Sequence, residues 1–224
     1  SGWCLLALMA MPLGGLASQG KMWIVHSYDN AATRYFASRN LKRNRQDFQM
    51  AGLAKRPNYK FARTHLLDDL MHAHDYRHRA RFPLTAYLFT SSGQKSDIEI
   101  THLPSTVIRF ALLAQKTVEG PWNQIVQRGE RLNTAVEIDE GKVINTRRNY
   151  FYEDLFELPN SAYGFLRRYL LRMPETRYKD RDDPRTTYSL IEEYDLVSWP
   201  LTDLYLHEVM NMDRERIEGI RTVA

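Results

Sequence analysis

Three histidines and one aspartate lie within the short segment HAHDYRH, and their side chains could do chemistry. Imidazole nitrogens and carboxylate oxygens bind divalent metal ions, and a bound ion can activate water for hydrolysis. If the segment is helical, His74 and His78 share one face with Asp75 beside them, whereas His72 lies well round the cylinder. The neighbouring arginines would also repel a cation: Arg77, Arg79 and Arg81. We therefore expect a basic surface with hydrogen-bonding histidines here, and no metal site.

Nucleophilic catalysis finds no support in the rest of the sequence. The single cysteine, Cys4, lies in an apolar run where its thiol should stay neutral and inert. The sequence has no serine in a G-x-S-x-G turn and no G-x-x-x-x-G-K-[ST] phosphate loop. Paired acidic residues such as Asp68-Asp69 are expected to be solvated. We expect no catalytic residue and no cofactor, and one cysteine without a disulfide partner favours the reducing cytoplasm.

Positive charge gathers in short clusters, although the formal net charge of the 224 residues is only +4. Arginine is favoured over lysine in them, as expected where planar guanidinium groups bind phosphate. Clustered cations release counterions when they neutralise phosphates, so they favour nucleic-acid binding. An ordinary solvated surface is the alternative, because the acidic residues nearly balance the basic ones. The candidate nucleic-acid-binding residues in these clusters are Lys42, Arg43, Arg45, Lys55, Arg56, Arg147 and Arg148.

Residues 85–110 are expected to form the element around which the rest is arranged. Tyr87 and Phe89 alternate on one strand, Ile98 and Ile100 alternate on the next, and SSGQK forms a polar turn between them. A helix follows, with Pro104 in its first turn. Its buried face should consist of Val107, Ile108, Phe110 and Ala111.

The remaining periodicity predicts a mixed α+β fold. Helices are expected at residues 33–53, 61–71, 120–126, 163–171 and from 199 onward, a strand at 22–27, and a hairpin within 132–145. The body should span residues 1–198, and residues 199–224 should begin a C-terminal helical region that is truncated. Both ends of the chain look cut from something longer, because the first residue is Ser1 and the last lies within a helical pattern.

The apolar run at residues 4–17 is expected to be part of a buried helix. It lacks the preceding positive charge and the A-x-A-like site of a signal peptide. It is also shorter than the roughly 20 residues that a membrane span requires. We therefore expect no membrane association.

Several of these segments, in their order, resemble the large subunit of type I-B CRISPR Cascade, an RNA-guided DNA surveillance complex. The central strand–turn–strand–helix and the WNQIVQRG segment that follows resemble that family, and so does YFASRNLKRN at residues 35–44. The resemblance rests on the order of the motifs along the chain. The segments that carry it are MPLGGLASQGKMWIVHS, YFASRNLKRN, SSGQKSDIEI, HLPSTVIRFALLA, WNQIVQRG and LTDLYLHEVMNMDRERIEGIR.

The resemblance implies a non-catalytic subunit that contacts the 5′ end of a guide RNA and the target double-stranded DNA, supporting R-loop formation. It implies backbone and small subunits as partners, with a helicase-nuclease or transposition proteins recruited to the complex. Gln94 and Lys95 match a turn of the family, and could contact base edges and phosphate respectively. A hairpin tip without function is the alternative.

Two other classes of function stay open from the sequence. His74-Asp75 matches the dipeptide of HD phosphohydrolases, so a metal-dependent phosphohydrolase or nuclease using His72, His74 and Asp75 is the main alternative. A scaffold that contacts only protein is the third class, and it would bind no nucleic acid in a salt titration.

Overall fold

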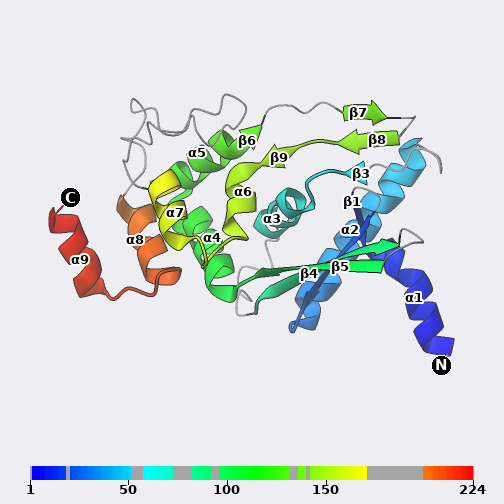
Figure 1. The fold of residues 1–224 in the computed structure, drawn as a ribbon, viewed down its shortest axis with the longest axis horizontal. Coiled ribbons are helices and arrows are strands. Elements are labelled where there is room, and N and C mark those ends of the chain that lie inside the picture. The colour runs from blue at the N-terminus through cyan, green and yellow to red at the C-terminus, as the bar shows by residue number, and fades with distance from the viewer. Residues whose placement is uncertain are drawn as a thin grey trace. The chain divides into compact units, whose positions relative to one another are not determined.

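The computed structural model describes residues 2–18, 21–51, 58–72, 82–91, 96–131, 136–139, 142–170 and 199–223 (Figure 1). Over these residues the chain is mixed α+β, as the sequence predicts. It divides into two compact units made of interleaved segments. Unit 1 consists of Ser1–His72, Phe82–His102 and Leu132–Arg148, and unit 2 of Ala73–Arg81, Leu103–Arg131 and Asn149–Ala224. The boundary expected between residues 198 and 199 stays a prediction.

Unit 1 is built on a four-stranded antiparallel sheet in the order β1-β2-β4-β5. Its strands are β1 (Leu16–Ser18), β2 (Lys21–Ser27), β4 (Leu84–Ser91) and β5 (Ser96–Leu103). β2 is antiparallel to both β1 and β4, and its Trp23 lies opposite Leu88. The strands expected around Tyr87 and Ile98 are confirmed, and the turn between them lies outside the described residues.

Two helices accompany the sheet in unit 1. α2 (Asn30–Ala51) packs against β2, and α3 (Ala62–His72) follows β3 (Asn58–Tyr59) in the sequence. The Asp29 carboxylate accepts a hydrogen bond from the Ala31 amide, which satisfies one of the free N–H groups where α2 begins. Phe36 and Leu67 are buried in the core of the unit. Both helices are confirmed within a few residues of their predicted bounds.

The first helix, α1 (Gly2–Gly14), is confirmed as a helix but is not buried. Trp3 is 81% exposed and Met9 is 72% exposed. The expectation of burial is therefore wrong, because an apolar composition fixes a preference for burial but does not supply a packing partner. The C-terminal end of α1 is joined to α2, where Asn40 and Asn44 donate hydrogen bonds to the carbonyl oxygens of Gly14, Leu13 and Gly15.

A smaller sheet in unit 1 has the order β3-β8-β7. The hairpin predicted within residues 132–145 is confirmed: β7 (Val136–Asp139) and β8 (Lys142–Asn145) are antiparallel, with Ile138 opposite Val143. β3 pairs with β8 in parallel. β9 (Arg148–Asn149) lies at the change from unit 1 to unit 2.

Unit 2 is helical around a cluster of aromatic side chains. In the described part of the chain its elements are α4 (Ser105–Thr117), α5 (Glu119–Gly129), β6 (Glu130–Arg131), α6 (Tyr150–Leu155), α7 (Ala162–Phe165), a π-helix (Leu166–Leu170), α8 (Trp199–Glu208) and α9 (Arg214–Val223). Pro104 is the residue before α4, one position earlier than the first turn expected for it.

The buried face predicted for α4 is confirmed, since Val107, Ile108, Phe110 and Ala111 are all fully buried. The Phe110 ring meets Trp122 edge to face at 5.9 Å and Tyr205 at 5.3 Å between ring centroids. These contacts place α8 against α4, so the predicted helix from residue 199 onward belongs to the core of unit 2.

The short helix α6 was not predicted, and a buried asparagine explains its start. The Asn149 side chain accepts a hydrogen bond from the Tyr152 amide and donates one to the Val126 carbonyl oxygen of α5. Gly129 lies against this asparagine: a Cβ there would fall 2.6 Å from Asn149 Oδ1 and 2.7 Å from Phe151 Cβ. The close approach of α5 and α6 therefore requires a residue without a side chain at position 129.

No helix in the described ranges is long and apolar enough to cross a membrane.

Candidate nucleic-acid interface

The outer face of α2 carries a stripe of exposed cations. Arg34, Lys42 and Arg45 are all exposed, and their spacing of eight and three residues brings them to one side of a helix with 3.6 residues per turn. Within the described part of the chain, these three side chains form no ion pair and no hydrogen bond. Of the predicted binding residues, Lys42 and Arg45 are therefore available to an external ligand. We name this set the α2 basic stripe.

Arg43, on the same helix, has an internal role. Its guanidinium donates two hydrogen bonds to the Asp69 carboxylate of α3, at 3.1 and 2.8 Å. Arg39 donates a further one to Asp69 at 2.5 Å, and the Tyr35 hydroxyl donates to the Asp69 carbonyl oxygen. Tyr35, Arg39 and Arg43 recur every four residues, so they lie along one face of α2. The contacts of these three residues with Asp69 join α2 to α3, and they fix the direction in which the α2 basic stripe points.

The expectation that Asp68 and Asp69 are solvated is wrong. The Asp69 side chain is 4% exposed between two arginines, and Asp68 accepts a hydrogen bond from Arg147 at 2.9 Å. Arg147 is thus held by Asp68, and it does not stand free on the surface. The guanidinium of Arg148 lies over the Phe61 ring, 4.6 Å from its centroid. Three predicted binding residues, Arg43, Arg147 and Arg148, therefore make contacts within unit 1.

Burial shifts the ionisation of the aromatic and imidazole groups near this network. It raises the pKa of Tyr59 to about 12 and that of Tyr35 above its usual value. It lowers the pKa of His65 to about 4, and the nearby Arg43 and Arg147 act in the same direction. The hydrogen bond to Asp69 raises the pKa of Arg39. His65 is therefore neutral at physiological pH.

The low pKa of His65 predicts a stability that depends on pH. The unfolded chain binds a proton at this histidine near pH 6.5, whereas the folded chain does so only near pH 4. The folded state therefore loses up to about 3 kcal/mol relative to the unfolded state as the pH falls through this window. Denaturant unfolding at several pH values should show this loss, and His65→Gln should reduce it because glutamine does not titrate. An equal loss in both proteins would contradict the assignment.

Four of the predicted binding residues lie outside the described residues: Lys55, Arg56, Gln94 and Lys95. His74, Asp75 and His78, which were considered as metal ligands, also lie outside the described residues. His72 is exposed, and its Nδ1 lies 2.6 Å from the Asp68 carbonyl oxygen. Among the residues that the structure describes, no group of three or more His, Cys, Asp or Glu side chains could hold a metal ion.

One face of the four-stranded sheet is open, which the sequence analysis missed. Thr85 of β4 contacts His102 of β5, so these two side chains lie on the same face of the sheet. Every second residue of a strand shares a face, which adds Tyr87 and Phe89 on β4 and Ile98 and Ile100 on β5. The pairing of β2 with β4 adds Met22, Ile24 and His26. Trp23, Val25, Leu84 and Ala86 lie on the opposite face and are buried. We define the open sheet face by Met22, Ile24, His26, Thr85, Tyr87, Phe89, Ile98, Ile100 and His102.

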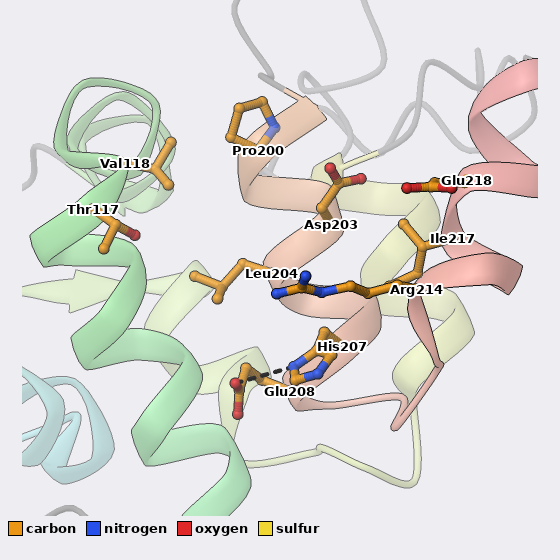
Figure 2. A pocket seen from close by; sticks show the side chains of 10 residues that line it. All are labelled: Thr117, Val118, Pro200, Asp203, Leu204, His207, Glu208, Arg214, Ile217 and Glu218. Atoms are coloured by element: carbon orange, nitrogen blue, oxygen red, sulfur yellow. Dashed lines mark hydrogen bonds and ion pairs between the residues drawn. The ribbon is translucent and has the colours of Figure 1, made fainter.

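Unit 2 has a pocket of about 660 Å³ between α4, α8 and α9 (Figure 2). His207 Nδ1 lies 3.2 Å from Glu208 Oε1, and Glu208 Oε2 accepts a hydrogen bond from Arg109. Arg214 reaches from α9 toward Leu204 in the same view. The lining carries three carboxylates, one guanidinium and one imidazole, so it shows no concentration of positive charge for a polyanion. The lining residues are Thr117, Val118, Pro200, Asp203, Leu204, His207, Glu208, Arg214, Ile217 and Glu218.

No protein-family model matches the chain, and neither the curated proteins nor the solved structures include a significant match.

Proposed function

We propose that the chain is a non-catalytic nucleic-acid-binding subunit of an RNA-guided DNA surveillance complex of the Cascade type. The observation that carries the proposal is the α2 basic stripe, in which Arg34, Lys42 and Arg45 are exposed on one side of a single helix. Each phosphate that such a side chain neutralises releases counterions and adds affinity.

The anchoring of α2 supports this proposal. Arg39 and Arg43 both form ion pairs with the buried Asp69, so the helix is fixed to α3 without involving the stripe. A binding surface held in place loses little conformational entropy when a ligand arrives. The stripe therefore presents its cations to a phosphodiester backbone from a helix that is held in place.

The ligands and partners that we propose follow from the resemblance of the sequence to the large subunit of type I-B Cascade. It makes guide RNA and target double-stranded DNA the ligands, and other subunits of the complex the protein partners, in the cytoplasm. In such a complex base pairing reads the target sequence, and the protein holds backbones and shape. Proteins recruited to the complex would hydrolyse or transpose the DNA.

The double variant Lys42→Ala/Arg45→Ala tests the stripe. We expect it to bind a fluorescent nucleic-acid strand roughly tenfold more weakly at about 100 mM salt, because two phosphate contacts are lost. Fluorescence anisotropy measures this affinity. Gln46→Ala/Gln49→Ala is the matched control, because both glutamines lie near the stripe on the same helix and carry no charge. Equal affinity of the two double variants would contradict the role of the stripe.

A further inference from the structure

The open sheet face has the composition of a base-stacking surface. Tyr87 and Phe89 project from β4 with ring centroids 6.2 Å apart and planes only 28° from parallel. Both rings are partly accessible, and Ile98 and Ile100 on β5 are 54% and 62% exposed. Flat rings at two-residue spacing on one strand present neighbouring π-faces, on which successive unpaired bases can stack.

Ring-bearing side chains continue to one end of the face. His26 and His102 are exposed, and His26 meets the ring of Tyr28 edge to face at 5.8 Å. Tyr28 itself is 80% exposed. Imidazole and hydroxyl groups at this edge can hydrogen-bond base edges or phosphate oxygens.

The open sheet face carries no carboxylate that would repel a polyanion. Among its described residues none is an aspartate or glutamate, and Glu99 of β5 alternates to the other face. A phosphodiester chain therefore meets no like charge there, and the two histidines supply the polar contacts.

We propose that the open sheet face binds single-stranded nucleic acid by stacking unpaired bases on Tyr87 and Phe89. This inference rests on the proposed function, and it adds that the ligand is a single strand and that its bases are contacted directly. The α2 basic stripe, by contrast, contacts phosphates alone. The bases stack on the two rings, while the strand's phosphates lie toward the edge of the face with His26 and His102.

The test measures the affinity of the full protein chain for two strands of equal length. One is a 12-nucleotide thymidine strand, and the other has the same phosphodiester backbone but no bases. We expect the thymidine strand to bind more tightly. Replacing both rings in Tyr87→Leu/Phe89→Leu should weaken its binding by roughly tenfold or more for each stacked base, and leave the abasic strand unchanged. Tyr87→Phe is the matched control, because it keeps the ring and should bind within about twofold of the original protein.

A second measurement does not depend on the folding of a variant. A strand carrying 2-aminopurine should lose fluorescence on binding the unaltered protein, because stacking on an aromatic ring quenches this base. Equal binding of the abasic and thymidine strands without quenching would overturn the stacking proposal and leave phosphate binding by the stripe intact. That outcome would make the face a protein-docking surface. Binding of neither strand would contradict the proposed function itself, and the stacking proposal with it.

Discussion

Replacing Asp69 by asparagine will destabilise unit 1 by about 4 kcal/mol. The carboxylate is 4% exposed and accepts hydrogen bonds from both Arg39 and Arg43. The asparagine keeps the shape but removes the charge, so two guanidinium groups lose their counterion beside the buried Tyr59 and His65. Removing one member of a buried ion pair is costly because it leaves the other charge uncompensated.

Denaturant unfolding measures the loss of stability in Asp69→Asn. Glu99→Gln is the control variant. Glu99 forms a longer ion pair with Arg63, at 3.7 Å, and is 52% exposed. Its removal should change the free energy of unfolding by less than about 1 kcal/mol, because exposed pairs contribute little. We also expect Asp69→Asn to weaken nucleic-acid binding, since α2 loses its attachment to α3. Similar losses of stability in the two variants would contradict the structural role of Asp69.

Replacing Phe110 by alanine will destabilise unit 2 by about 4 kcal/mol. The ring is fully buried on α4 and touches both Trp122 of α5 and Tyr205 of α8. Alanine leaves a cavity among rings that are themselves in contact, because Tyr205 stacks on Phe165 at 5.2 Å. The surrounding helices can close such a cavity only in part, so the lost contacts are not recovered.

Native-state hydrogen exchange measures this loss within each unit. Phe110→Ala should lower the protection of amides in α4 and α8 more than that of β2 and β4, because the ring packs in the core of unit 2. Phe110→Leu is the control, with a loss near 1 kcal/mol, because leucine fills most of the space. An equal loss for leucine and alanine would contradict the cavity as the cause, because leucine fills most of the space that alanine leaves empty.

The sequence predicted the elements whose signals are local. The 3.6-residue spacing of Val107, Ile108, Phe110 and Ala111 suffices to identify the buried face of α4. The alternation about Asp139 identified the hairpin β7-β8, and the apolar run at Met22 identified β2. In each case the information lies within a dozen consecutive residues.

The interactions that the sequence did not predict depend on residues far apart in the chain. Arg43 and Asp69 are 26 residues apart, and Asp68 and Arg147 are 79 apart. Nothing local distinguishes a buried carboxylate that binds arginines from a solvated one. The open sheet face was missed for the same reason, because alternation shows that two faces exist but not which of them a helix covers. The exposure of α1 likewise depends on tertiary packing.

The most direct test of nucleic-acid binding is the salt dependence of affinity for a labelled strand, with the strand's length checked on a gel afterwards. We expect the logarithm of the binding constant to fall linearly with the logarithm of salt concentration between about 50 and 200 mM. The slope should decrease by roughly 1.4 in Lys42→Ala/Arg45→Ala, and the strand should remain intact. An affinity that does not change with salt, or a strand cut by the purified protein alone, would contradict it.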